Sequence, residues 1–192
     1  MKYSDNKFYR VVRCVVCFIF RIIFRPNIIN LDFIPNEGKI ILAGNHISIL
    51  DPILIMCSTK RQIHFLAKKE LFTGFKGVIF RHLGLISVDR NSKDNNALNY
   101  AREYLNNDLV VGIFPEGTTE KSNYPNLLEF KYGAVKLSKD TESKIIPFRI
   151  NGKYKIFGKK VNIILGKPLK KLSNLEEYNK LLYNVVDSMK EV

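Results

Sequence analysis

Short apolar runs alternate with helical patterns through most of this chain of 192 residues. Six runs have the length and composition of β-strands: 39–44, 62–67, 85–88, 109–114, 144–150 and 161–166. Helical patterns lie between or after them, near residues 52–58, 94–106, 130–140 and 174–190. Strands that are apolar throughout are buried on both faces, and intervening helices allow neighbouring strands to run parallel. The sequence therefore predicts a single α/β domain with a largely parallel central sheet flanked by helices.

The segment before this pattern, residues 8–24, predicts an amphipathic helix that Pro26 ends. Its longest uncharged run, 14–20, is far shorter than the roughly 20 residues that a membrane-spanning helix needs. No small-residue cleavage site follows, so a signal peptide is not favoured. One arc of the helix carries the basic residues together with two cysteines: Arg10, Arg13, Arg21 and Arg25, with Cys14 and Cys17. The remaining face is apolar and aromatic.

A wide apolar face opposite an arc of arginines is typical of a helix that lies in the bilayer interface, with the arginines toward anionic headgroups. The alternative is an ordinary amphipathic helix packed on the domain's own core. We expect residues 1–30 to form a membrane-interface helix and residues 31–192 to form the folded domain. The protein would then be peripheral or monotopic at the cell membrane, on its cytoplasmic face.

The charge balance favours an anionic partner. Lys and Arg total 31 against 18 Asp and Glu, which gives a formal net charge of +13. Phospholipid headgroups, phosphorylated substrates, acidic carrier proteins and nucleic acid all fit such a charge, so the charge alone selects none of them. The three cysteines, Cys14, Cys17 and Cys57, lack the second pair that a zinc site needs. We interpret them as reduced thiols in apolar surroundings, in a reducing cytoplasmic compartment.

Residues 43–52, AGNHISILDP, follow the first predicted strand of the domain and carry the candidate catalytic pair. His46 and Asp51 are five positions apart and would point in different directions on one helix. They can meet if His46 lies in the loop and Asp51 in the first turn of the next helix, with Ser48 as the N-cap and Pro52 in that first turn. A carboxylate there would orient the imidazole as a general base. The alternative is a loop histidine beside a helix-capping aspartate.

Polar and cationic residues follow other predicted strands at the edge of the sheet where parallel α/β folds bind ligands. Glu116 and Thr118, in the turn 115–118, could bind hydroxyl groups, and the turn's amides could face a phosphate. Lys68 and Arg90 follow two further strands and could contact a phosphate. Each of these residues, taken alone, is equally consistent with an ordinary surface loop.

Taken together, these segments resemble the glycerolipid acyltransferase family. NHISILD (45–51) is similar to its N-H-x-x-x-x-D signature, and three later blocks follow in the family's order: GLISVDR (84–90), FPEGT (114–118) and IIPFRI (145–150). AKKEL (67–71) and FKYGA (130–134) are similar to stretches between those blocks, so the resemblance covers roughly residues 38–168. A chance match of four ordered motifs is very improbable.

The resemblance implies an acyltransferase domain over residues 31–192, with His46 as the general base and Asp51 as its orienting partner. It also implies the substrate-binding residues Asn45, Ser48, Lys68, Arg90, Glu116, Gly117 and Thr118. Pro147 and its neighbours would form part of the acyl-donor side. The expected acceptor is lysophosphatidic acid, the expected donor is acyl-coenzyme A or acyl carrier protein, and no metal or other cofactor takes part.

One departure from the family pattern affects the acceptor. FPEGT is usually followed by Arg, whereas Thr119 and Glu120 stand here, so Lys121, Lys68 or Arg90 would have to compensate. The alternatives are therefore another lysolipid or amino-lipid acceptor, or a non-catalytic basic protein on a membrane. Nucleic-acid binding is not favoured, because the basic residues are spread along the chain instead of interleaving with aromatic platforms. A serine hydrolase is not favoured either, since no G-x-S-x-G motif occurs.

Overall fold

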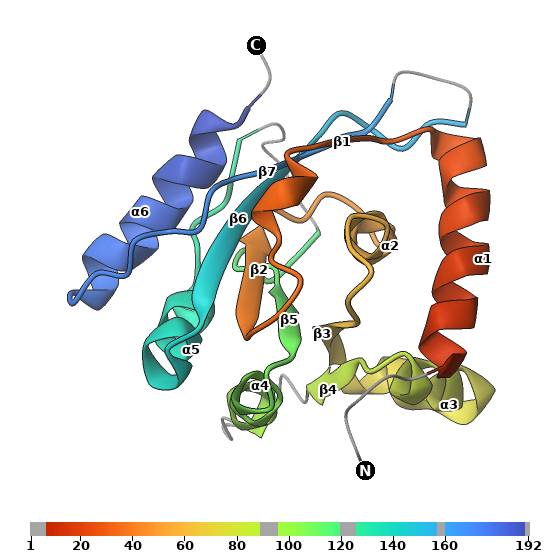
Figure 1. Ribbon diagram of the computed structural model, residues 1–192, viewed down its shortest axis with the longest axis horizontal. Coiled ribbons are helices and arrows are strands. Elements are labelled where there is room, and N and C mark those ends of the chain that lie inside the picture. The colour runs from red at the N-terminus through yellow and green to blue at the C-terminus, as the bar shows by residue number, and fades with distance from the viewer. Residues whose placement is uncertain (1–6, 89–95, 120–125, 157–159, 191–192) are drawn as a thin grey trace.

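The computed structural model describes residues 7–88, 96–119, 126–156 and 160–190 (Figure 1). Within these residues the chain forms one seven-stranded sheet in the order β1-β7-β6-β2-β5-β3-β4. The strands are β1 (Asn27–Ile29), β2 (Ile40–Gly44), β3 (Ile63–Lys68), β4 (Ile86–Val88), β5 (Val110–Ile113), β6 (Lys144–Asn151) and β7 (Asn162–Leu165). Among these pairs only β6 with β7 is antiparallel, so the prediction of a largely parallel sheet is confirmed.

Helices cover both faces of the sheet and give the α/β architecture that the sequence predicts (Figure 1). On one face lie α1 (Lys7–Phe24) and α2 (Asp51–Met56), whose buried side chains join one apolar cluster with those of the strands. On the other face lie α4 (Asn96–Asn106), α5 (Gly133–Thr141) and α6 (Leu175–Ser188), which contribute to a second cluster. The central strand β2 sends Ile40 and Leu42 into the first cluster and Ile41 and Ala43 into the second.

The six predicted strands and the helices at α1, α2, α4, α5 and α6 are confirmed, with boundaries that differ by a few residues. Strand β1 and the helix α3 (Gly74–His82) were not predicted. Strand β1 has three residues and depends on its pairing with β7, and α3 has a weak amphipathic pattern with two glycines. The structure also contains two short 3-10 helices, Leu31–Phe33 and Lys69–Phe72.

Helix α1 packs on α2, and its arginines do not point as the sequence analysis expected. Arg13 donates from Nε to the carbonyl oxygens of Met56 (3.1 Å) and Thr59 (2.7 Å), and Arg21 donates to that of Cys57 (2.9 Å). The expectation that all the arginines face headgroups is therefore wrong for these two. Free carbonyls at the C-terminal end of a helix attract cations, which accounts for the inward direction.

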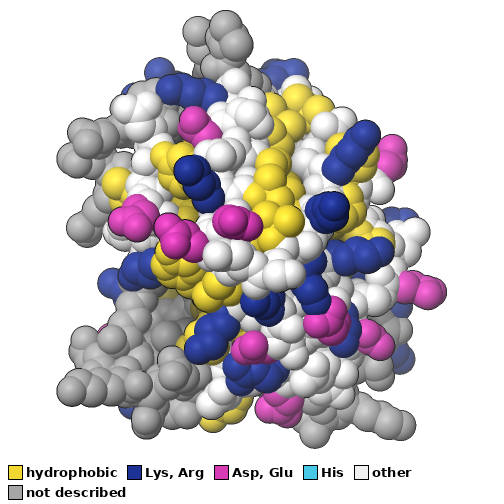
Figure 2. Space-filling view, turned by 90° about the vertical axis from the view of Figure 1, so that its left-hand side faces the viewer, with side chains coloured by type: hydrophobic (Ala, Val, Ile, Leu, Met, Phe, Trp, Pro, Cys, Tyr) yellow, Lys and Arg dark blue, Asp and Glu magenta, His cyan; other side chains and the backbone are white. Residues whose placement is uncertain are grey.

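The opposite side of α1 is apolar and open to solvent. Its exposed large side chains are Phe8, Val11, Val15, Phe18, Ile19 and Ile22. Tyr9, Cys17 and Phe20 are buried against the domain, and α1 contains no acidic residue. Within the described part of the chain, no helix has both the length and the apolar character needed to cross a bilayer. By contrast, cationic and anionic side chains are mixed on the face bearing α6 and α5 (Figure 2).

His64 in β3 is a buried histidine on the side of the sheet that α4 covers. Its Nδ1 bonds to the carbonyl oxygen of Gly84 (2.7 Å), its ring lies 4.3 Å from that of Tyr104, and it is 4% exposed. Its Nε2 is buried and has no hydrogen-bond partner among the residues that the structure describes. Burial, opposed in part by the bond to Gly84, lowers the pKa of His64 from 6.5 to about 4.

We expect His64 to make the protein less stable in mild acid. Between its unfolded pKa of 6.5 and its folded pKa of about 4, the unfolded chain binds a proton that the folded chain does not. Stability is therefore fully present above this window and falls through it, by about 2 kcal/mol at about pH 5. Urea unfolding at neutral pH and at about pH 5 should show a smaller fall for His64→Leu. The exposed control His82→Gln should retain the wild-type fall, and an equal fall in all three proteins would contradict this assignment.

Candidate active site

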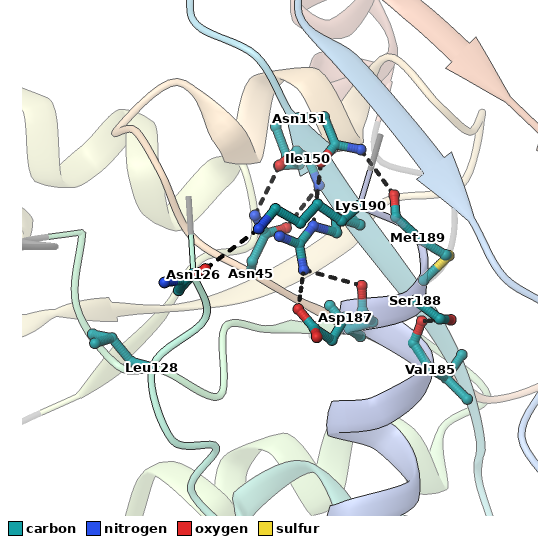
Figure 3. A network of polar contacts seen from close by, with 12 residues as sticks. Asn45, Asn126, Leu128, Ile150, Asn151, Val185, Asp187, Ser188, Met189 and Lys190 are labelled. Atoms are coloured by element: carbon teal, nitrogen blue, oxygen red, sulfur yellow. Dashed lines mark hydrogen bonds and ion pairs between the residues drawn. The ribbon is translucent and has the colours of Figure 1, made fainter. Parts of the chain in front are cut away.

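The site begins where β2 ends. A Cβ on Gly44 would lie 2.1 Å from the carbonyl oxygen of Phe148 in β6, so only glycine fits there. The next residue, Asn45, pairs with the backbone of Ile150: its Oδ1 accepts from the amide (2.7 Å) and its Nδ2 donates to the carbonyl (2.8 Å) (Figure 3). Asn45 thus fixes the loop to β6. Both bonds direct the buried side-chain amide of Asn45 toward β6. The predicted contact of Asn45 with substrate stays a prediction.

The carboxylate of Asp51 holds that loop around itself. Its Oδ2 accepts hydrogen bonds from His46 Nδ1 (2.7 Å), Ile47 N (2.6 Å) and Ser48 N (2.9 Å). Its Oδ1 accepts from the hydroxyl of Tyr154 (2.6 Å), and its side chain is fully buried. The predicted meeting of His46 and Asp51, a loop histidine with a first-turn carboxylate, is confirmed.

The start of α2 differs in detail from the prediction. The helix begins at Asp51, its N-cap residue is Leu50, and Pro52 lies in the first turn as predicted. Ser48 is therefore not the N-cap; its Oγ accepts from the amide of Leu50 (3.2 Å). The capping prediction was wrong because Asp51 itself binds the amides of the preceding loop, which leaves the serine outside the helix.

The imidazole of His46 is fixed by a hydrogen bond at its edge and by ring stacking on its face, and it is partly exposed to solvent. Its ring stacks on that of Phe114, with centroids 3.9 Å apart and planes inclined by 13°. Its side chain is 18% exposed. Because Nδ1 faces a carboxylate, the neutral ring carries its proton there and leaves Nε2 as a proton acceptor. A group bound beside Nε2 could lose a proton to it.

Glu116, in the turn after β5, supports the backbone of His46. Its Oε1 accepts from the His46 amide (2.9 Å), and its Oε2 accepts from the Leu128 amide (2.8 Å). The side chain is buried. These bonds give Glu116 a part in positioning the loop that the sequence analysis did not foresee, while its predicted contact with substrate stays a prediction. The neighbouring Gly117 has a φ of +71°, which glycine adopts without strain.

A cation that the sequence analysis missed lies against this turn. The ammonium nitrogen of Lys131 is 3.0 Å from where a Cβ on Gly117 would stand, and the Lys131 amide donates to the carbonyl oxygen of Pro115 (3.0 Å). Lys131 belongs to the FKYGA stretch noted above, which was the available signal. The turn 115–118 and Lys131 belong to separate segments, and the sequence pattern alone does not indicate that they are in contact.

The other predicted binding residues have different placements. Lys68 ends β3 with an exposed side chain, at the same edge of the sheet as the end of β2. Thr118 follows Gly117 in the turn and is partly exposed. Arg90, Glu120 and Lys121 lie outside the described residues. Pro147 is buried in β6, in register with Ala43 of β2.

A polar network fastens β6 to the end of α6 beside the Asn45 contact (Figure 3). Arg149 is 2% exposed and donates from Nη1 to Asp187 Oδ1 (3.1 Å) and to the carbonyl oxygen of Val186 (3.3 Å). Asn151 donates to the carbonyl oxygen of Met189 (3.0 Å). These bonds flank Ile150 on both sides and therefore stabilise the strand to which Asn45 is fixed.

Metal binding is not supported by the side chains that the structure describes. No group of three or more His, Cys, Asp or Glu among them is arranged to hold a metal ion. The three cysteines are free thiols, with Cys17 and Cys57 buried and Cys14 exposed. The arrangement at His46 therefore offers acid–base chemistry from side chains, and the expected absence of a cofactor stays an expectation.

The site combines a His–Asp pair after one strand of a parallel α/β sheet with a glutamate–glycine turn after a neighbouring strand, and comparison with known proteins gives this combination a class. The sequence model of the family described as Acyltransferase matches residues 25–151. Because this match covers more than half of the chain, the chain belongs to the acyltransferase family. The resemblance inferred from the sequence motifs is confirmed.

Particular relatives narrow the comparison. The chain is 29% identical to the 1-acyl-sn-glycerol-3-phosphate acyltransferase of Streptococcus pneumoniae over 92% of its length and 67% of the relative's. It is 28% identical to the enzyme of the same name from Borreliella burgdorferi, of which it spans only 62%. In structure it is similar to the 1-acyl-sn-glycerophosphate (LPA) acyltransferase PlsC from Thermotoga maritima, with a TM-score of 0.74, 25% identity, and coverage of 97% of this chain and 82% of that one.

Proposed function

We propose that this protein transfers a fatty acyl group from a thioester to the sn-2 hydroxyl of 1-acylglycerol-3-phosphate (lysophosphatidic acid), which gives phosphatidic acid. The observation that carries the proposal is the buried Asp51 carboxylate on Nδ1 of the partly open His46 ring. The names of the relatives support the reaction and the acceptor.

The proposed chemistry is direct transfer with general base catalysis. His46 Nε2 takes the proton of the acceptor hydroxyl as its oxygen attacks the thioester carbonyl. The tetrahedral adduct collapses with cleavage of the carbon–sulfur bond, and the departing thiolate takes the proton back from the imidazolium. Asp51 stabilises that imidazolium while it exists and keeps the ring oriented. The donor would be acyl-coenzyme A or acyl carrier protein, which present the same thioester.

The acceptor phosphate would bind beside the turn at Gly117. Lys131 supports this placement because its ammonium group lies against a turn whose glutamate contacts the His46 backbone. Lys68 and Arg90 remain proposed phosphate ligands. Another lysolipid or an amino-lipid is the alternative acceptor, motivated by Thr119 and Glu120 in place of the family's usual arginine.

The membrane surface is the proposed location of the reaction, at the cell membrane on its cytoplasmic face. The exposed apolar side of α1 supports this proposal, because six large apolar side chains along one helix would otherwise face water: Phe8, Val11, Val15, Phe18, Ile19 and Ile22. A non-catalytic basic membrane protein would also have such a helix. The buried carboxylate that orients His46 favours the enzyme, since burying a charge is costly and a binding protein gains nothing from it.

We expect His46→Ala to lower acyl transfer by about 10³-fold or more, because general base catalysis would be lost. Thiol release from acyl-coenzyme A or acyl carrier protein, with lysophosphatidic acid as acceptor, measures the loss. His46→Asn, which retains an N–H toward Asp51, should be equally inactive, and circular dichroism should show both variants folded. The exposed control His82→Gln should keep wild-type turnover. Turnover in a folded His46→Ala protein would remove the proposed base.

We expect Lys131→Ala to weaken use of the phosphorylated acceptor. Loss of a charge-assisted contact should raise KM for lysophosphatidic acid about ten-fold, with KM for the acyl donor unchanged. The exposed lysine Lys136 on α5 provides the matched control Lys136→Ala. Equal effects of the two variants, or an equal rise in KM for the donor, would place Lys131 away from the phosphate.

We expect Phe18→Asp with Ile22→Asp to release the protein from anionic lipid vesicles. The two side chains are 67% and 52% exposed on α1, so the substitutions should leave the fold intact while removing apolar contact with lipid. Co-sedimentation with vesicles of phosphatidylglycerol and phosphatidylethanolamine measures the change. Tyr100→Asp, at an exposed position of α4 across the sheet, is the control. Unchanged sedimentation of the α1 variant would mean that α1 does not contact lipid.

A further inference from the structure

Tyr154 touches both the interfacial helix and the proposed catalytic pair. Its hydroxyl donates to Asp51 Oδ1 at 2.6 Å, from a position 103 residues further along the chain. Its ring meets those of Phe24 and Phe20 in α1 edge to face, with centroids 5.7 Å and 6.1 Å apart. One side chain therefore connects α1 to the carboxylate that orients His46.

The bond from Tyr154 completes the set of donors around Asp51. The other three donors that the described residues give this carboxylate all bind Oδ2, whereas Tyr154 binds Oδ1. Burial is the main cause that raises the pKa of Tyr154 well above its usual range. The charge of Asp51 and its hydrogen bond raise the pKa further. The phenol therefore stays protonated at neutral pH and donates to Asp51. Without it, Oδ1 loses this donor and the negative charge of the carboxylate is less shared, which changes how Asp51 acts on the imidazole.

Helix α1 also contacts the other end of α2. Where α2 ends, Arg13 and Arg21 bind the carbonyl oxygens of residues 56, 57 and 59. Where α2 begins, Phe20 and Phe24 contact the ring of Tyr154, whose hydroxyl binds Asp51. Helix α2 has only six residues and cannot be stable by itself. The position of Asp51 therefore depends on how α1 is seated.

We propose that Tyr154 is a positioning residue that makes the orientation of His46 by Asp51 depend on the seating of helix α1. The proposal rests on the function proposed above, because it gives Tyr154 a role only if His46 is the base. The same helix presents Phe18 and Ile22 outward, so the lipid-facing element and the base are joined through one hydroxyl group.

The predicted signature is a change in the pH profile. A hydroxyl that donates to Asp51 withdraws negative charge from it, and its loss leaves a carboxylate that attracts the protonated imidazole more strongly. Among the described residues, the charged or titratable groups near this pair include Glu116, which binds the His46 amide, Cys57, which acts on Tyr154, and Arg21, which binds the Cys57 carbonyl. None of them is changed by Tyr154→Phe, so a shift reports the lost hydroxyl.

The first experiment is acyl transfer by full-length Tyr154→Phe over a range of pH. We expect kcat/KM to fall about ten-fold and the acidic limb of its pH profile to move up by about half a unit to one unit. Tyr100→Phe, which removes an exposed hydroxyl from α4, is the control and should match the wild type. A wild-type profile for Tyr154→Phe, with His46→Ala inactive, would overturn this proposal and leave the proposed function standing. Turnover by His46→Ala would overturn the proposed function instead.

The second experiment tests the connection to α1. Phe24→Leu keeps an apolar side chain but removes the edge-to-face contact with Tyr154. We expect it to shift the acidic limb in the wild-type background and to add no shift in the Tyr154→Phe background. All variants are assayed with substrates dispersed in the same detergent, so that differences in lipid binding do not affect the comparison. Additive shifts, or no shift from Phe24→Leu alone, would show that α1 does not act through Tyr154. The control Tyr100→Leu, at an exposed position of α4, should leave the profile unchanged.

Discussion

The buried carboxylate of Asp51 is the interaction on which the site depends. A charged group without exposure to water costs several kcal/mol unless donors surround it. The structure supplies four donors, from His46, Ile47, Ser48 and Tyr154. They come from the loop after β2 and from the segment after β6, so both segments must fold correctly before this charge is stable. The geometry of the imidazole is a result of that requirement.

Much of this arrangement could be predicted, because it follows from local spacing. Apolar runs predict the strands, and the five-residue interval between His46 and Asp51 allows their contact across a loop and a helix start. The remaining contacts join distant segments: Glu116 binds a residue 70 positions away, and Tyr154 one 103 positions away. A single sequence gives no signal for such pairs. Strand β1 and the lysine at Gly117 depend on tertiary placement in the same way.

The direction of the α1 arginines shows another limit of local reasoning. A helical projection correctly separates the basic arc from the apolar face, but it does not say which of them meets the protein. The carbonyl groups at the end of α2 decide this, because they offer Arg13 and Arg21 a better partner than water. A basic arc that resembles a headgroup-binding surface is, at these two positions, an internal contact.

Two guanidinium groups bound to fixed carbonyls keep α1 from rolling about its own axis. The apolar side of the helix therefore points in one direction relative to the sheet. If that side enters lipid, the whole domain stands on the bilayer with a single tilt, and the partly exposed ring of His46 lies at one constant height above the acyl chains. A helix attached only by apolar packing could settle at many rotation angles. Under the proposed function, the arginines would thus set how deep in the interface a hydroxyl must lie to reach His46.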